Sequence, residues 1–181
     1  MSHFYETITP ELTDFIRRQP IYFVATATEK GRINLSPKGM DTFRVLNDKT
    51  VAYLDLTGSG AETSAHIQHD GRMTIMFCSF DEKPLILRLY GRGENVRPSD
   101  AKWDDLIANF TPIPGQRQII VLHVESLQTS CGFAVPRMEL VEERQMLIEW
   151  AVNQGPDKVV EYRAKKNRVS IDGLPNALVS D

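Results

Sequence analysis

Short runs of β-branched and aromatic residues recur through the first two-thirds of the chain, and turn residues separate them. The runs cover residues 21–27, 33–36, 42–45, 50–55, 73–79, 85–96 and 118–127. Such residues favour strands, whereas Gly, Pro, Asn and Asp favour tight turns. Closely spaced strands with few helices between them favour an antiparallel barrel over a sandwich with long crossovers. The sequence therefore predicts a mainly β fold.

Helical patterns flank or interrupt these runs at a few places. Thr9 before Pro10 has the pattern of an N-cap and a first helical residue, and this predicts an amphipathic helix reaching about Gln19. Further helices are predicted over 61–68, from 98–100 to about 110, and over 141–154, where Gly155 and Pro156 end the last one. The tail from Tyr162 to Asp181 can pack on the barrel, pack on a partner subunit or be loosely ordered.

Composition restricts the class of protein. A chain of 181 residues with 41% hydrophobic and 25% charged residues fits one folded domain. The net charge of −3 and the scattered Lys and Arg do not favour nucleic acid as a partner. No secretory signal pattern or membrane-spanning apolar run is visible. Cys78 and Cys131 lie in apolar neighbourhoods and are expected to be buried thiols of a reducing compartment. We therefore expect a cytoplasmic protein.

A glycine-containing stretch from Leu56 to Ser64 joins a predicted strand to a predicted helix. Gly58 and Gly60 permit positive φ values and let a ligand approach the backbone. The helix N-terminus adds free N–H groups and a positive dipole end, which suit a phosphate. Hydroxyl groups available as further donors belong to Thr57, Ser59, Thr63 and Ser64. The same residues also suit a glycine-hinged turn with a Ser or Thr helix cap, and the stretch is neither a Walker loop nor a dinucleotide fingerprint.

Two cations on predicted strands are candidates for anion binding. Ser36-Pro37-Lys38-Gly39 ends a strand and brings a hydroxyl and an ammonium group to the rim of the barrel, although an ordinary type I turn explains this segment equally simply. Alternation places Arg88 on one strand face with Ile86 and Tyr90. An arginine on so apolar a strand must reach solvent or an anionic partner, either a cofactor or an interface carboxylate.

Motifs for metal binding and hydrolysis are not evident. His66 and His69 are three residues apart on a predicted helix, but no third ligand accompanies them, so we expect solvated or capping roles and no metal site. The chain has no nucleophile elbow, no Ser/His/Asp order and no paired acidic motif. No catalytic residue can be assigned from the sequence.

Taken in order, these segments resemble the pyridoxamine 5′-phosphate oxidase-like family of flavin-binding split barrels, and in particular an uncharacterised branch of it. The resemblance runs from Thr7 to about Pro136. It includes the stretches Leu54-Asp55-Leu56-Thr57-Gly58-Ser59-Gly60, Leu87-Arg88-Leu89-Tyr90-Gly91-Arg92-Gly93 and Ser130-Cys131-Gly132-Phe133-Ala134-Val135-Pro136. It implies a six-stranded antiparallel split barrel over residues 1–136, with the C-terminal helix and tail of residues 137–181 packed on the same domain.

The resemblance also implies a homodimer that holds FMN in clefts between its subunits. By this likeness Ser36 and Lys38 would lie near the flavin, and Thr57, Thr63 and Ser64 would lie on the phosphate side. Asn34 and Leu56 would offer edge or backbone contacts to the ring. The predicted cofactor-binding set is completed by Gly58, Ser59 and Arg88.

The chain departs from true pyridoxamine phosphate oxidases. Ala61-Glu62-Thr63 stands where they carry Ser-Arg-Lys, Ile86 stands where they carry glutamine, and their basic, tryptophan-containing C-terminus is missing. Oxidation of pyridoxamine phosphate is therefore not expected. The resemblance implies an FMN-dependent oxidoreductase with a small-molecule electron donor or acceptor. Two alternatives stay open: a non-catalytic binder of flavin, deazaflavin F420 or haem on the same barrel, and a barrel without a cofactor.

Overall fold

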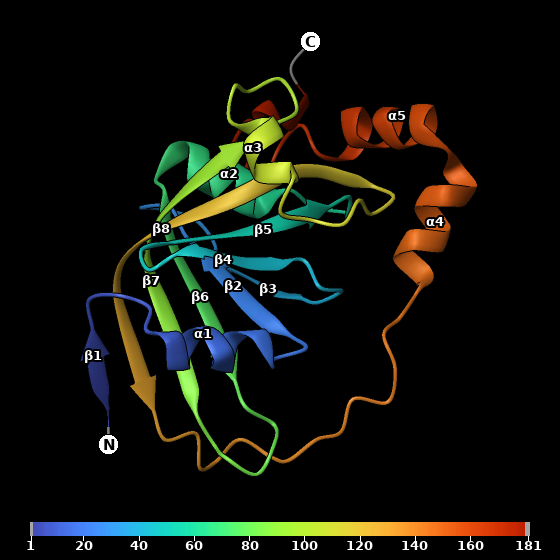
Figure 1. The fold of residues 1–181 in the computed structure, drawn as a ribbon. Coiled ribbons are helices and arrows are strands. Elements are labelled where there is room, and N and C mark those ends of the chain that lie inside the picture. Colours follow the sequence, from blue (N-terminus) through green and yellow to red (C-terminus); the bar gives the residue numbers. More distant parts are fainter. Residues whose placement is uncertain (1, 180–181) are drawn as a thin grey trace.

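The computed structural model describes residues 2–179, and its centre is one curled antiparallel sheet of eight strands (Figure 1). The strands are β1 (His3–Tyr5), β2 (Tyr22–Thr26), β3 (Asn34–Lys38), β4 (Phe43–Asn47), β5 (Thr50–Leu56), β6 (Arg72–Cys78), β7 (Ile86–Val96) and β8 (Gln116–Ser130). Their order is β3-β2-β6-β7-β8-β5-β4, and β1 pairs with β8. Because β3 and β4 end the order without pairing to each other, the sheet forms a half-barrel.

The predicted mainly β split barrel is confirmed, and its eight strands are one more than the seven predicted runs and two more than the six that the resemblance implies. Every predicted run forms a strand. The additional strand β1 has only three residues, too few to show a pattern, and it pairs with Leu127–Thr129 near the end of β8. Tertiary pairing therefore creates a strand that local propensity does not indicate.

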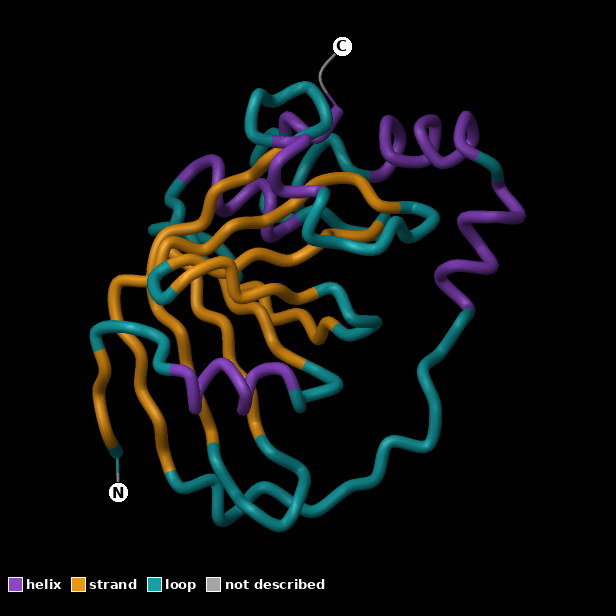
Figure 2. The backbone as a smooth tube through the Cα atoms, viewed as in Figure 1, coloured by secondary structure: helices purple, strands orange, loops and turns teal. Residues whose placement is uncertain are grey.

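The helices are α1 (Pro10–Arg17), α2 (Glu62–His69), α3 (Trp103–Ile107), α4 (Met146–Gln154) and α5 (Pro156–Lys166), followed by a 3-10 turn (Ala177–Val179). Helix α1 lies across the strands, and the C-terminal helices lie apart from the sheet (Figure 2). The predicted N-cap is confirmed, since the Thr9 side chain accepts from the Leu12 N–H. The helix predicted over 141–154 begins only at Met146, because Val141 and its neighbours are exposed and have nothing to pack against. Pro156 begins α5, which the sequence analysis did not predict.

The main core lies on one face of the sheet, where α1 packs, and a smaller cluster with α3 lies on the other. Alternation along β5 divides its residues between the two. Val51 and Tyr53 join the main core, whereas Ala52 and Leu54 join the smaller cluster. Asp55 continues the series of Val51 and Tyr53. A carboxylate is therefore directed toward the main-core side at the end of β5.

At two positions of β7 only glycine fits, because a neighbouring element lies very close to the backbone. A Cβ at Gly91 would lie 1.9 Å from the His123 carbonyl oxygen, at the bulge where β7 and β8 shift register. A Cβ at Gly93 would lie 2.7 Å from Cγ1 of Ile67 in α2. These contacts explain the glycines in the Leu87–Gly93 stretch and let α2 pack closely on the sheet.

The C-terminal third leaves the sheet and returns to it. A connecting segment (residues 131–145) runs around the outside of the half-barrel from β8 to α4 (Figure 1). Trp150 of α4 packs edge-on against Tyr162 of α5 with centroids 5.0 Å apart. The C-terminal segment (residues 163–178) then lies against α2 and the loop before it. Among the described residues, no helix is long and apolar enough to cross a membrane.

Candidate functional site

Three of the predicted site residues share the main-core face of β3. In the register of β2 and β3, Lys38 pairs with Tyr22, Ser36 with Val24 and Asn34 with Thr26. Cross-strand partners point to the same face, and all three β2 residues are buried. Because side chains alternate along a strand, the intervening Leu35 and Pro37 are exposed.

This face of β3 adjoins the first turn of α2. Asn34 Nδ2 donates to Thr63 Oγ1 over 3.0 Å, and Ser36 Oγ donates to Asn34 Oδ1 over 3.2 Å. The structure therefore brings together Asn34, Ser36, Lys38 and Thr63, which we call the β3 cluster. All four side chains are partly exposed.

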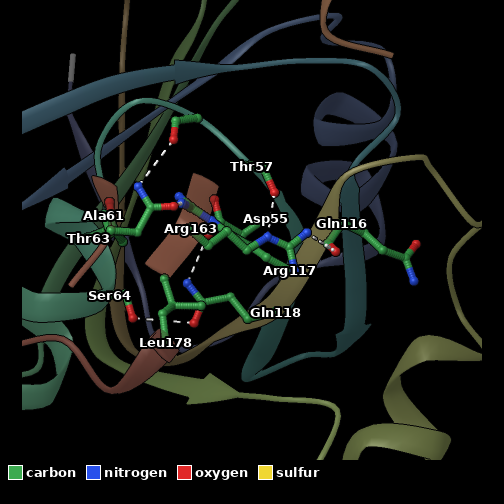
Figure 3. A network of polar contacts seen from close by, with 12 residues as sticks. Asp55, Thr57, Ala61, Thr63, Ser64, Gln116, Arg117, Gln118, Arg163 and Leu178 are labelled. Carbon is green, nitrogen blue, oxygen red and sulfur yellow. Dashed lines mark hydrogen bonds and ion pairs between the residues drawn. The ribbon is translucent and has the colours of Figure 1, made fainter. Parts of the chain in front are cut away.

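Lys38 is connected to a buried carboxylate. Its Nζ lies 3.3 Å from Asp55 Oδ1, while Arg117 Nε and Gln118 Nε2 donate to Asp55 Oδ2 over 2.7 and 2.8 Å (Figure 3). Burial opposes ionisation of Asp55, but the charges of Arg117 and Lys38 and these hydrogen bonds lower its pKa to about 2. Two cations share one carboxylate. Since the Arg117 side chain is buried and that of Lys38 is 25% exposed, the excess positive charge faces outward at Lys38.

A buried hydroxyl lies next to this group. Lys38 Nζ lies 5.7 Å from the centroid of the Tyr53 ring. Tyr53 is fully buried, and among the described residues no hydrogen-bond partner is found for its hydroxyl. Burial raises the pKa of Tyr53 well above its usual value, so the group is a neutral donor. Buried hydroxyls are usually paired, so a buried hydroxyl without a partner is unusual.

Hydrogen bonds connect the loop before α2 and the first turn of α2 to β8 and to the C-terminal segment. The Thr57 hydroxyl donates to the Gly115 carbonyl over 2.7 Å and accepts from Arg163 Nε over 2.8 Å (Figure 3). Ser64 Oγ lies 3.3 Å from Gln118 Oε1 and 3.0 Å from Asn176 Oδ1. Both hydroxyls are buried in these contacts. Thr57 and Ser64, predicted on the phosphate side, connect the loop and α2 to the rest of the chain through these hydroxyls.

The loop glycines do not use the backbone freedom expected of them. Neither Gly58 nor Gly60 has a positive φ. A Cβ at Gly58 would meet nothing within 4 Å, so there is open space at that position. Ala61 stands at the N-cap of α2, and among the described residues no side-chain hydrogen bond caps the helix. The alternative of a Ser or Thr cap is therefore not realised, and within residues 2–179 the first N–H groups of α2 have no side-chain partner.

The other predicted residues differ in position. Ser59 is exposed at the loop, and Leu56 packs against the smaller cluster. Arg88 pairs with Gln128 near the end of β8 and donates to Ser130 Oγ over 3.2 Å. The loop lies at the opposite end of β8, where Leu56 pairs with Gln116. Within one chain, Arg88 is therefore not brought to the loop.

A cavity of about 530 Å³ adjoins Lys38. Its walls come from the β2 and β3 strand ends, from Phe80, and from the segment around residues 138–147, and apolar side chains predominate: Ile21, Pro37, Phe80, Met138, Leu140, Met146 and Leu147. This volume is in the usual range for small-molecule sites. Lys38 belongs both to the β3 cluster and to the wall of this cavity.

The histidines and cysteines differ from expectation in part. His66 is buried rather than solvated, with Nδ1 3.1 Å from Thr26 Oγ1, and His69 Nε2 lies 3.2 Å from the Pro175 carbonyl oxygen. Both cysteines are free; Cys78 is buried, but Cys131 is only partly so. Within residues 2–179, no group of three His, Cys, Asp or Glu side chains is arranged to hold a metal ion.

The family follows from a comparison of the sequence. Residues 8–131 match the family model described as pyridoxamine 5′-phosphate oxidase. The chain belongs to this family. A curated relative in Aspergillus flavus, "Pyridoxamine 5'-phosphate oxidase family protein ustO", is 37% identical over an aligned length of 195 residues. The match covers 97% of this chain and 78% of the relative.

Solved structures agree with the family fold. A variant of HupZ from Group A Streptococcus has a TM-score of 0.55 at 26% identity, covering 68% of this chain and 99% of HupZ. The FAD binding protein from Mycobacterium smegmatis has a TM-score of 0.51 at 14% identity, covering 67% and 91% of the two chains. The second likeness concerns the fold alone.

Two arginines bring positive charge to the loop of this family member, although the helix start lacks it. Arg117 of β8 donates from NH1 to the Gly60 carbonyl over 3.1 Å. Arg163 of α5 donates to the Gly115 and Gln116 carbonyls over 3.1 and 2.9 Å, besides its bond to Thr57. Burial, and then the charge of Arg117, lower the pKa of Arg163. The position of Arg117 beside the apolar run 119–122 could have indicated a buried cation that needs a partner. Nothing in the sequence indicates that Arg163 lies at the loop.

Proposed function

We propose that this protein binds flavin mononucleotide between the loop of residues 57–63, the β3 cluster and the cavity beside Lys38, and that it is a flavin-dependent oxidoreductase. The observation that carries this proposal is the position of Lys38, which is shared by a polar cluster and an apolar cavity. FMN has the same division, with a polar phosphate and ribityl chain at one end and a flat ring at the other.

The phosphate end is supported by donors and by charge. The uncapped start of α2, Thr63 and the neighbouring β3 residues offer N–H and hydroxyl groups. The loop region carries one positive charge in excess. It contains three cations, Lys38, Arg117 and Arg163, and two carboxylates, Asp55 and Glu62. An anion is stabilised where uncapped helix N–H groups and a positive charge occur together.

The ring end is supported by the cavity. Apolar walls exclude water from a flat ring, and the Lys38 ammonium supplies a positive charge beside it. When bound, FMN supplies the ability to take a hydride from a reduced donor and to pass electrons on. The M. smegmatis protein with the same fold is named as an FAD binding protein.

A homodimer with the cofactor at the subunit interface belongs to the same proposal. Arg88 lies far from the loop within one chain, so it can reach a cofactor only across an interface. Large apolar side chains are exposed on the edge strand β3, just before it and on the connecting segment: Leu35, Ile33, Phe133 and Leu140. Such exposure is typical of an interaction surface. Light scattering of the purified protein should give the mass of two chains, and a monomer mass would contradict this part.

Titration with FMN tests the proposal directly. The full chain should quench the fluorescence of added FMN at a one-to-one ratio and gain thermal stability from it. Anaerobic addition of NADH or NADPH should then bleach the bound flavin if the protein is an enzyme, and should leave it yellow if the protein only carries flavin. Absence of both quenching and stabilisation would refute FMN binding. A cytoplasmic location stays a prediction of the sequence alone.

A further inference from the structure

The C-terminal segment holds the carbonyl groups of the candidate phosphate loop. Asn167 Nδ2 donates to the Gly58 carbonyl over 3.2 Å, and Asn176 Nδ2 donates to the Ala61 carbonyl over 3.2 Å. Both asparagines are buried, with 0% and 5% of their surface exposed. They lie beyond residue 131, where the match to the family model ends.

Arg117 bonds to Asn167 and to a third carbonyl of the loop. Its NH1 donates both to the Gly60 carbonyl, over 3.1 Å, and to Asn167 Oδ1, over 3.0 Å. Three carbonyls of the loop therefore have donors from β8 and the C-terminal segment. These three contacts are made to the backbone of the loop and do not depend on its side chains.

Fixing these carbonyls also fixes the opposite ends of the same peptide units. The described chain has no cis peptide bond, and in a trans peptide the C=O and the following N–H point in opposite directions. When the carbonyls of Gly58, Gly60 and Ala61 are bonded to Arg117 and the asparagines, the N–H groups of Ser59, Ala61 and Glu62 point away from those donors. These N–H groups lie at and before the start of α2, where unpaired N–H groups and the positive end of the helix dipole favour an anion.

The C-terminal segment also engages the acidic residue at this helix start. The Ile171 N–H donates to the two carboxylate oxygens of Glu62 over 3.0 and 3.2 Å. One residue further on, Asp172 accepts from the Arg32 N–H over 2.7 Å and forms an ion pair with the Arg32 guanidinium. The contact with Ile171 directs the carboxylate of Glu62 toward the C-terminal segment, which reduces its repulsion of an anion at the N–H groups.

We infer that the C-terminal segment shapes the loop for an anionic group, and that Asn167 and Asn176 are positioning residues for the phosphate of FMN. This inference rests on the proposed function. The two asparagines do not touch the phosphate. They act through the backbone of the loop, so their removal should weaken recognition of the phosphate and leave recognition of the flavin ring intact.

Comparison of FMN with riboflavin, which has the ring and ribityl chain but no phosphate, separates these effects. The full-length protein and the Asn167→Ala/Asn176→Ala variant are titrated with each ligand, and Asn153→Ala, at an exposed position of α4, is the control. We expect the wild type to bind FMN at least about tenfold more tightly than riboflavin. The double variant should lose about tenfold in FMN affinity, with riboflavin affinity within about twofold of wild type.

Two outcomes would overturn the inference while the proposed function stands. In the first, the double variant keeps its FMN affinity. In the second, FMN and riboflavin affinities fall by the same factor, which indicates general damage to the protein. If the wild type binds neither ligand, the proposed function itself fails, and the inference fails with it. Should the double variant not fold, Asn167→Ala and Asn176→Ala are titrated singly, and each should lose about threefold for FMN only.

Discussion

Arg117 Nε lies 2.7 Å from Asp55 Oδ2, and both side chains are buried where β5 ends and β8 begins beside the loop. Their residues are 62 positions apart in the sequence. The pair neutralises itself in the interior, and because Lys38 bonds to the other oxygen of Asp55, the remaining positive charge is left at the candidate site. The ion pair therefore connects the stability of the barrel to the electrostatics of the site.

Breaking this pair should destabilise the protein strongly. Asp55→Asn leaves the buried Arg117 guanidinium without a counter-charge, and we expect the free energy of unfolding in urea to fall by about 3–5 kcal/mol. Arg137→Met breaks the pair with Glu82, in which both side chains are largely exposed, and serves as the control. Equal stability of Asp55→Asn and the control would show that the buried pair contributes nothing.

The same carboxylate should make the protein sensitive to acid. In the folded protein the pKa of Asp55 is about 2, below the ordinary value of 3.8. As the pH falls, the unfolded chain therefore binds a proton first. The contribution of Asp55 is complete above about pH 5 and is lost as the pH falls toward 2, and it amounts to about 2 kcal/mol. Urea midpoints measured from pH 6 to pH 3 should fall more steeply for the wild type than for Asp55→Asn. Parallel curves would contradict the assignment.

Removing the charge of Lys38 should affect the ligand more than the fold. Lys38→Met keeps the length of the side chain, and Asp55 keeps its bonds to Arg117 and Gln118. We expect FMN affinity to fall about tenfold, with the loss smaller at high salt, because screening weakens the contribution of a partly exposed charge. Fluorescence titrations at two ionic strengths measure this, with Lys30→Met in the exposed 29–32 turn as the matched control. The same affinity in both variants would remove Lys38 from the site.

The glycine at the bulge of β7 should tolerate no side chain. Gly91→Ala places a Cβ 1.9 Å from a backbone oxygen of β8, and neither strand can move without breaking the ladder. We expect a loss of about 3 kcal/mol in the free energy of unfolding. At Gly58, where an added Cβ meets nothing within 4 Å and φ is not positive, alanine should change stability by less than about 0.5 kcal/mol. Thermal denaturation of both variants makes the comparison, and a stable Gly91→Ala protein would contradict the packing described here.

Much of the barrel could be predicted from local patterns. The seven runs of β-branched and aromatic residues all form strands, and the cap at Thr9 is formed as predicted. Alternation along a strand also explains why Asn34, Ser36 and Lys38, which the family resemblance predicts near the cofactor, lie on one face. The N-terminal strand and α5 were missed. β1 forms through pairing with β8, and the sequence analysis took Pro156 as the end of a helix although it begins one.

The surroundings of the loop could not be predicted in the same way. Spacing indicated a glycine-hinged turn with hydroxyl donors, but Thr57 and Ser64 are used in internal contacts, and no side chain of the described residues caps α2. The donors that hold the loop, Asn167 and Asn176, lie 109 and 115 residues away from their carbonyl partners. No periodicity or motif connects positions so distant in the chain.

The sequence by itself determined the half-barrel, its family and the shared face of β3, because strand propensity and alternation act between residues close in the chain. Only the tertiary structure decided which charges meet. It joined Asp55 to Arg117 and Lys38, separated Arg88 from the loop, and brought the C-terminal segment onto the loop carbonyls. The physical reason is that buried charges and carbonyls must find partners wherever the packed core leaves them, and chain distance does not limit that choice.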